Sequence, residues 1–181
     1  ILYKVEGKEV TGKDLSKVVS KIKGEKGTTV ELTVLRGENA KEVTVTATRD
    51  TVQAQTIEYK LMDDKIGYIR VSEFDTVTYD QYEEALDDLE KQGMTGLVVD
   101  LRNNPGGSLS TVCDMLDLML PKGLIVYTED KDGKKTEMKS DEEHQFTKPL
   151  AVLVNGNSAS ASEIYSGAIQ DYGIGKIVGT Q

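Results

Sequence analysis

The chain has 181 residues, of which 38% are hydrophobic and 29% are charged, and its formal net charge at pH 7 is −9. This balance is typical of a folded globular protein, and the acidic surplus disfavours nucleic acids and anionic membranes as partners. The single cysteine, Cys113, excludes an internal disulfide and any metal site built from cysteines. It falls in the apolar row of a predicted helix, so we expect it to pack in the core. No apolar run approaches the length of a membrane span, and the first residues do not resemble a signal peptide.

Residues 1–50 are predicted to form a compact, β-rich unit. The pattern over residues 1–5 is typical of a strand, and the segment up to Val10 has the turn chemistry of a hairpin-like reversal. Residues 29–36 and 42–48 alternate between apolar and polar side chains, which indicates two half-buried antiparallel strands.

A helix is predicted between these strands, over residues 13–23. Its apolar face repeats at i, i+3, i+4 and i+7 and consists of Leu15, Val18, Val19 and Ile22. Thr11 and Asp14 have the spacing of a capping box at its start.

Residues 51–65 connect this unit to the remainder of the chain. They contain a predicted strand over residues 56–61, which forms a hairpin with a further strand over residues 66–71.

A second helix is predicted over residues 79–92, and Thr78 and Gln81 again have capping-box spacing. Acidic side chains gather on its outer side. We expect this side to be solvated rather than to hold a metal ion.

Two βαβ units are predicted in the second half of the chain. The first consists of a strand, a helix and a strand over residues 96–101, 109–120 and 124–128. The second repeats that order over residues 150–154, 160–172 and 176–179. The buried, nearly continuous apolar strands predict an α/β fold with a parallel or mixed sheet covered by helices.

A charged insert lies between the two βαβ units. Residues 129–135 have the composition of a hairpin tip. The only histidine, His144, falls in the polar loop that follows, where we expect it to be solvated.

Two loops carry the chemistry that this chain offers. One contains Asn104-Pro105-Gly106-Gly107 and the other runs from Asn155 to Glu163, and both follow predicted parallel strands. The carboxyl ends of such strands meet at one edge of the sheet, so we expect the loops to lie together. A serine at a strand-to-helix turn suits a nucleophile, and it equally suits an ordinary helix N-cap. Glycine amides suit an oxyanion, and the same glycines suit a tight turn with positive φ.

A nucleophilic serine also needs a base that takes its proton. His144 has no orienting signature around it in the sequence. The alternative is a lysine whose pKa is lowered by burial.

In combination, three segments resemble the carboxyl-terminal processing (tail-specific) proteases, which are serine peptidases that pair a PDZ domain with a Ser-Lys catalytic core. They are IGYIRVSEF, GLVVDLRNNPGGSLS and PLAVLVNGNSASASEIYSGAIQDYGIGKIVGT. The resemblance implies a crotonase-like or Clp-like β-β-α peptidase core and no metal or organic cofactor. It makes Ser160 the nucleophile. It assigns the oxyanion hole to the amides of Gly106 and Ala161, with Gly107 as the neighbouring candidate.

The first 36 residues resemble the second half of a PDZ domain, whose first half would precede Ile1. The implied organisation is a partial PDZ domain over residues 1–50, a linker and strand over residues 51–65, and a peptidase core over residues 66–181. Peptides bind PDZ domains as an added strand beside a helix, so the four apolar helix residues named above (Leu15, Val18, Val19 and Ile22) are groove candidates and equally core candidates.

The general-base lysine of the family comes in a Phe/Tyr-Gly-Lys-Gly motif after the strand that matches residues 176–179. Residues 1–181 stop short of that motif, and Lys176 does not match it. We therefore expect the parent protein to be a peptidase and residues 1–181 alone to be inactive.

By resemblance, the expected activity is cleavage of unfolded chains, or of proteins near accessible C-termini, outside the cytoplasm. The resemblance leaves a homo-oligomer open. One alternative is a non-catalytic peptide-binding module with a PDZ-like and a protease-like part. A weaker alternative is an acyl-CoA enzyme on a crotonase-like fold, against which the alternating serines and the PDZ-like half argue.

Overall fold

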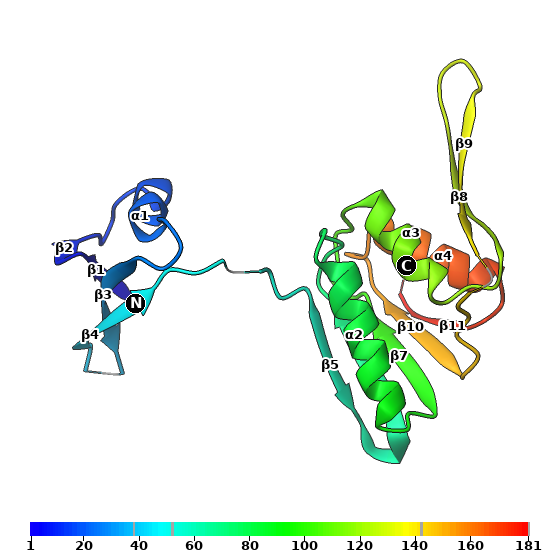
Figure 1. Ribbon diagram of the computed structural model, residues 1–181, viewed down its shortest axis with the longest axis horizontal. Helices are drawn as coiled ribbons and strands as arrows, with labels where there is room; N and C mark the ends of the chain where they lie inside the picture. Colours follow the sequence, from blue (N-terminus) through cyan, green and yellow to red (C-terminus); the bar gives the residue numbers. More distant parts are fainter. Residues whose placement is uncertain (38, 52, 142, 181) are drawn as a thin grey trace. The chain divides into compact units, whose positions relative to one another are not determined.

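The computed structural model describes residues 1–37, 39–51, 53–141 and 143–180 and divides into two compact units (Figure 1). Unit 1 is Ile1–Gln53 and unit 2 is Ala54–Gln181. Each unit has its own sheet and its own buried core. The predicted mixed α/β fold is confirmed.

Unit 1 contains an antiparallel sheet in the order β2-β1-β3-β4. Its strands are β1 (Leu2–Val5), β2 (Lys8–Glu9), β3 (Thr29–Arg36) and β4 (Lys41–Thr48). β3 and β4 pair without a break from Thr29↔Thr48 to Arg36↔Lys41, as their alternating pattern predicts. The small core consists of Val5, Val10, Val18 and Val30.

The apolar residues of the unit 1 helix, α1 (Leu15–Ile22), differ in how deeply they are buried. Val18 is buried, whereas Leu15 is 76% exposed. Asp14 is the N-cap, and its side chain accepts from Lys17 N at 3.1 Å. The predicted capping box starting at Thr11 is therefore wrong, because Asp14 occupies the cap position itself.

Unit 2 is built on a five-stranded mixed sheet in the order β11-β10-β7-β6-β5. Its strands are β5 (Ile57–Leu61), β6 (Ile66–Val71), β7 (Gly96–Asp100), β10 (Leu150–Val154) and β11 (Lys176–Gly179). A single 3-10 turn, η1 (Asp63–Lys65), joins β5 to β6. β5 is antiparallel to β6, and the remaining neighbours are parallel. The strand predicted within residues 51–65 thus belongs to this sheet.

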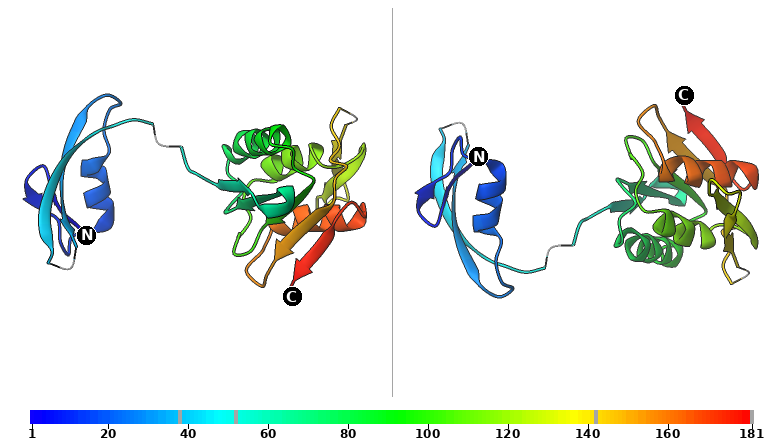
Figure 2. Two further views of the ribbon diagram at one scale, coloured as in Figure 1. Left: turned by 90° about the horizontal axis from the view of Figure 1, so that it is seen from below. Right: turned by 90° about the horizontal axis from the view of Figure 1, so that it is seen from above.

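The three helices of unit 2 cover one face of its sheet (Figures 1 and 2). They are α2 (Thr78–Lys91), α3 (Leu109–Asp117) and α4 (Ala161–Asp171). The parallel strands follow one another in a constant direction, so right-handed crossovers place every helix on the same side. The core between the layers includes Ile69, Leu97, Val99, Val152 and the predicted core residue Cys113.

One predicted strand lies outside this sheet. Residues 124–128 belong to β8 (Gly123–Glu129), which pairs only with β9 (Lys135–Ser140) in a separate hairpin. The predicted first βαβ unit is therefore wrong, because the parallel neighbour of β7 on that side is β10. Asp130 Oδ1 accepts from Asp132 N and Lys134 N, so the hairpin tip closes locally. The hairpin projects away from the layers of unit 2 (Figure 1).

The start of α2 also differs from the predicted capping box. Val77 is the N-cap, and Gln81 Oε1 accepts instead from Thr56 N and Ile57 N, at 3.0 and 3.2 Å. The side chain of Gln81 thereby fixes the start of β5 against α2. The local pattern could not reveal this, because the partner lies about 25 residues earlier in the chain.

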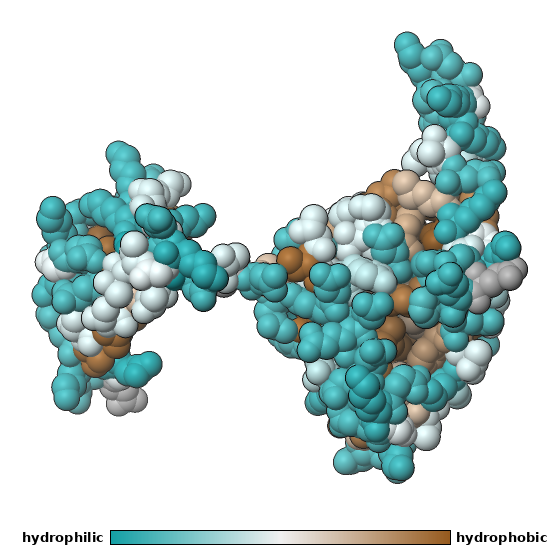
Figure 3. Space-filling view, in the orientation of Figure 1, coloured by the Kyte–Doolittle hydropathy of each residue, from teal (hydrophilic) through white to brown (hydrophobic). Residues whose placement is uncertain are grey.

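Hydrophilic residues cover most of the face shown in Figure 3, in each unit. Among the described residues, no group of His, Cys, Asp and Glu has the arrangement of a metal site. None of the helices in the described ranges is long and apolar enough to cross a membrane.

Candidate active site

The two loops singled out in the sequence meet at one edge of the unit 2 sheet. Ser158 Oγ donates to Leu101 O at 2.7 Å, and Ser162 Oγ donates to Asn104 O at 3.0 Å. Ala159 N donates to the same Asn104 carbonyl at 3.1 Å. The loops follow β7 and β10, which are adjacent parallel strands, so the expectation that they share an edge is confirmed.

These contacts distinguish the three alternating serines. The hydroxyls of Ser158 and Ser162 are both engaged in joining the loops, and Ser162 is completely buried. Ser160 is exposed at the N-cap position of α4. Of the three, Ser160 is the most exposed, since Ser158 is half-buried and Ser162 is buried.

Ser160 has an unusual backbone conformation. Its φ is 54° and its ψ is −115°, a region that residues with a Cβ rarely adopt. The chain passes there directly from a strand and a short loop into a helix. A nucleophile elbow has the same character, because a sharp and strained strand-to-helix turn lifts the serine above the sheet.

Gly106 lies directly against this turn. A Cβ on Gly106 would stand 2.7 Å from Ser160 Cβ and 2.9 Å from Ala161 N, and its φ of 103° also requires glycine. The Asn-Pro-Gly-Gly loop therefore reaches the predicted nucleophile at a distance that only a glycine allows.

The two glycines predicted to bind the oxyanion differ in whether their amides already have a hydrogen-bond acceptor. Gly106 N donates to Asn104 Oδ1 at 2.8 Å and is thus engaged within the loop. Gly107 forms a parallel bridge with Phe74, in which Phe74 N donates to Gly106 O and Ser108 N donates to Phe74 O. This pattern turns the amide of Gly107 away from Phe74, and Gly107 is exposed.

Ala161, the third predicted donor, is the first residue of α4. Its amide is among the four at the start of a helix that lack a partner within the helix. Ala161 itself is buried, while Ser160 before it is exposed.

Asn104 connects the elements around the site. It is completely buried, and its Nδ2 donates to Val71 O, at the end of β6, at 2.9 Å. Its Oδ1 accepts from Gly106 and its carbonyl accepts from Ala159 and Ser162. One side chain and one peptide group thus join β6, the glycine loop and the serine loop.

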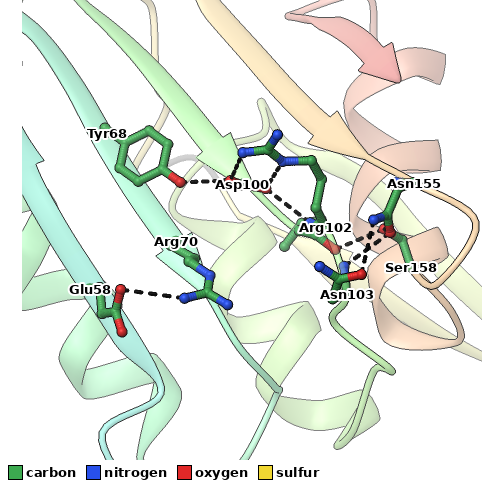
Figure 4. Close-up of polar contacts among 9 residues, drawn as sticks. Glu58, Tyr68, Arg70, Asp100, Arg102, Asn103, Asn155 and Ser158 are labelled. Carbon is green, nitrogen blue, oxygen red and sulfur yellow. Dashed lines mark hydrogen bonds and ion pairs between the residues drawn. The ribbon is translucent and has the colours of Figure 1, made fainter. Parts of the chain in front are cut away.

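A second asparagine cluster joins the same loops at the surface. Asn103 N donates to Asn155 Oδ1 at 3.0 Å, and Asn155 Nδ2 donates to Asn103 Oδ1 at 3.0 Å (Figure 4). Asn157 Nδ2 donates to the same Asn103 oxygen. These reciprocal bonds fix the register of one loop on the other.

A charged network lies beside the asparagine cluster. Asp100, at the end of β7, accepts from Arg102 Nε at 2.9 Å, from Arg102 Nη2 at 2.6 Å and from the Tyr68 hydroxyl at 2.6 Å (Figure 4). Burial favours the neutral acid, but the hydrogen bonds from Arg102 and Tyr68 outweigh it and lower the pKa of Asp100 to about 2. Together with Arg70 and its partner Glu58, these residues line a polar hollow of about 440 Å³.

Among the described residues, neither His144 nor Lys176, which does not match the family motif, is hydrogen-bonded to Ser160. His144 is exposed in the loop before β10. Lys176 pairs with Ala151 at the start of β11, whereas the serine loop follows Val154, which pairs with Gly179. Three residues of strand separate those two levels by about 10 Å.

Of the predicted groove residues in unit 1, Ile22 lines a hollow in the described part of the chain. That hollow, of about 460 Å³, is also lined by Val30, Leu32 and Ala47. Val18 belongs to the buried core of the unit, and Val19 is half-buried. Val18 thus has the core position that the sequence left open, and the groove assignment of Leu15, Val19 and Ile22 stays a prediction.

Comparison with known families matches residues 65–181 to the model described as Peptidase family S41. This chain belongs to that family. The match begins just before β6 and includes both loops of the site.

The chain is similar in sequence to proteins that are named carboxyl-terminal processing proteases. It is 37% identical over 171 residues to the carboxy-terminal processing protease CtpA of Bacillus subtilis (strain 168), covering 94% of this chain and 36% of that protein. It is 36% identical over 179 residues to the carboxyl-terminal-processing protease of Synechocystis sp., covering 97% of this chain and 42% of that protein. The chain thus spans well under half the length of these relatives.

A solved structure with a similar fold is the photosystem II D1 C-terminal processing protease. The TM-score is 0.62 at 29% sequence identity, over 97% of this chain and 50% of that one. This similarity extends through both units of the present chain.

Sequence reasoning missed two residues that hold the candidate site together, Asn104 and Glu163. Asn104 was visible only as part of a turn motif, and nothing in the pattern showed that it would be buried with every polar group engaged. Glu163 accepts from Ser160 N at 2.7 Å. The spacing Ser160-x-x-Glu163 is that of a capping box and was the available signal.

Proposed function

We propose that Ser160 is the nucleophile of a serine endopeptidase. The observation that carries this proposal is the contrast among the three serines. The hydroxyls of Ser158 and Ser162 hold the loops together, while Ser160 is exposed on a strained turn against Gly106. A strained backbone that surrounding contacts maintain is typical of a functional position.

The proposed reaction begins when Ser160 Oγ attacks the carbonyl carbon of the scissile peptide. A neutral lysine takes the hydroxyl proton and later gives it to the leaving amine, and water then hydrolyses the acyl-enzyme. Ala161 N and Gly107 N donate to the developing oxyanion. Gly106 N takes part only if it leaves Asn104 Oδ1. We assign the lysine, by family resemblance, to the Phe/Tyr-Gly-Lys-Gly motif, which residues 1–181 do not contain.

For substrates, we propose unfolded chains and protein tails. The relatives are named for carboxyl-terminal processing. The sequence of unit 1 resembles the second half of a PDZ domain, and we propose that it contacts the substrate. Its apolar hollow beside Ile22 is a candidate contact for an extended peptide. We propose a crotonase-like or Clp-like core for unit 2 and a location outside the cytoplasm, both by the same resemblance.

Cleavage of fluorescein-labelled casein by the full-length protein tests this assignment. We expect Ser160→Ala to abolish cleavage, because no other exposed serine lies on the turn. Ser166→Ala is the matched control, since Ser166 Oγ donates to the backbone carbonyls of Ser162 and Glu163 within α4 and to neither of their side chains. Undiminished cleavage by Ser160→Ala would refute the nucleophile. We expect residues 1–181 alone to show no peptidase activity.

The second candidate function is a non-catalytic peptide-binding module, and the apolar hollow of unit 1 favours it. Titration of C-terminal peptides into full-length protein, together with the casein assay, separates the two. Peptide binding without any cleavage would select the module.

A further inference from the structure

Glu163 contacts both peptide groups of the proposed nucleophile. Its Oε2 accepts from Ser160 N at 2.7 Å, and its own amide donates to Ser160 O at 2.9 Å. The first contact joins a charged acceptor to a peptide donor, and such hydrogen bonds are short and strong. Among the described residues, Glu163 is the acceptor for the Ser160 peptide nitrogen.

This contact bears on the conformation of Ser160. With φ at 54° and ψ at −115°, Ser160 occupies a region that its Cβ disfavours, so neighbouring contacts must maintain it. Gly106 makes room for Ser160 Cβ, and its carbonyl accepts from Phe74 N, while Ser160 N donates to Glu163. Relaxation to a negative φ would swing the Cα–Cβ bond, and with it the hydroxyl, to a different direction.

The Glu163 carboxylate does not compete with the proposed oxyanion for the amide of Ala161. It binds the amide of Ser160, one residue before Ala161, whose amide is a proposed oxyanion donor. A negative charge in the first turn is favourable at the positive end of the helix dipole of α4. Glu163 can therefore hold the turn without occupying the Ala161 donor.

We propose that Glu163 is a positioning residue of the peptidase, which fixes the backbone of Ser160 through the 2.7 Å hydrogen bond. This inference rests on the proposed function, in which Ser160 is the nucleophile. Glu163 itself touches no reacting atom. Its effect should therefore appear in the rate of acylation and not in substrate binding.

Three substitutions in the full-length protein separate the hydrogen bond from the charge. Glu163→Gln keeps an oxygen acceptor of the same reach but loses the charge. Glu163→Asp keeps the charge in the first turn but is one methylene too short, and Glu163→Ala removes both. Asp171→Ala is the matched control, because it removes one carboxylate from the exposed opposite end of the same helix.

Steady-state cleavage of fluorescein-labelled casein gives kcat and KM for each variant. We expect Glu163→Ala and Glu163→Asp to lower kcat about 10- to 100-fold, because a small displacement of a nucleophile has effects of that order. We expect KM to stay within about twofold, and Glu163→Gln and Asp171→Ala to stay within about threefold of the parent kcat. The rate of labelling by a fluorophosphonate probe should follow kcat, since it reports Ser160 without a protein substrate.

The outcomes are distinguishable from failure of the proposed function. If Ser160→Ala still cleaves, the nucleophile assignment itself is wrong. If Ser160→Ala is inactive while Glu163→Ala and Glu163→Asp match the parent, only the role of Glu163 is overturned. If Glu163→Gln lowers kcat as much as Glu163→Ala does, the charge of Glu163 matters rather than its hydrogen bond to Ser160 N. If a Glu163 variant raises KM and leaves kcat unchanged, Glu163 contacts the substrate. Either result overturns the positioning role.

Discussion

At position 106, a single methyl group decides whether the two loops of the site can touch. A Cβ there would lie 2.7 Å from both Ala159 O and Ser160 Cβ, with no flexible side chain to yield. We expect Gly106→Ala to destabilise the fold by about 1–3 kcal/mol, through overpacking and an unfavourable φ, and to lower peptidase activity.

Urea unfolding measures the stability effect, with Gly156→Ala as its control. Gly156 lies in the serine loop, but a Cβ there would meet nothing within 4 Å. Equal stability of the two variants would show that the loops are not pressed together at Gly106.

Asp100 links stability to pH. Its pKa falls from 3.8 to about 2 on folding, so the unfolded chain binds more protons between those values. The stabilisation is complete above about pH 4 and is lost as the pH falls through 2. We expect Asp100→Asn to lose about 2 kcal/mol at pH 7, and the difference from the parent to shrink between pH 4 and pH 2.

Urea unfolding at pH 7, 4, 3 and 2 checks this window. Glu58→Gln is the control, because the ion pair between Glu58 and Arg70 is exposed and contributes little. A loss in Asp100→Asn that stays constant with pH would show that the Asp100 carboxylate is not the titrating group.

At the scale of elements, the link between α2 and β5 depends on one side chain. Gln81 accepts from Thr56 and Ile57 and donates to Ala54 O at 2.7 Å. We expect Gln81→Ala to destabilise unit 2 by about 1–2 kcal/mol, because it leaves these peptide groups without that partner. Faster amide exchange at residues 56 and 57 is the measurement, and Gln92→Ala at the other end of α2 is the control. If amide exchange at residues 56 and 57 is the same in Gln81→Ala as in the parent, Gln81 does not hold β5 against α2.

Elements with a strong period were predictable, and elements that depend on distant partners were not. β3, β4 and the helices follow their apolar repeats to within a few residues. The apolar run of β8 resembles a sheet strand, yet a tight local turn pairs it with β9 instead. The two site loops were predictable from the rule that they share a sheet edge. The roles of Asn104 and Gln81 were not, because their partners lie at distant positions in the sequence.

At the scale of the molecule, the chain has two separate cores. The core of unit 1 contains four buried residues, whereas that of unit 2 contains many more. A unit of this small size buries a modest apolar surface and is correspondingly less stable. We expect calorimetry to resolve two transitions, with unit 1 unfolding first.

Paired substitutions assign those transitions. Val18→Ala should destabilise unit 1 by about 2 kcal/mol and leave the second transition unchanged, while Val152→Ala should do the reverse. Both residues are buried valines, so the two changes remove the same atoms. A shift of both transitions by either variant would argue against independent units.

The backbone of Ser160 sets a limit on how stable this chain can become. With φ at 54° and ψ at −115°, the position suits glycine better than any residue with a side chain. Selection for stability alone would therefore replace the serine, and selection for a reactive hydroxyl would retain it. If Ser160 is the nucleophile as proposed, a stabilising substitution at position 160 should abolish catalysis, and directed evolution for heat resistance must find its gains elsewhere in the chain.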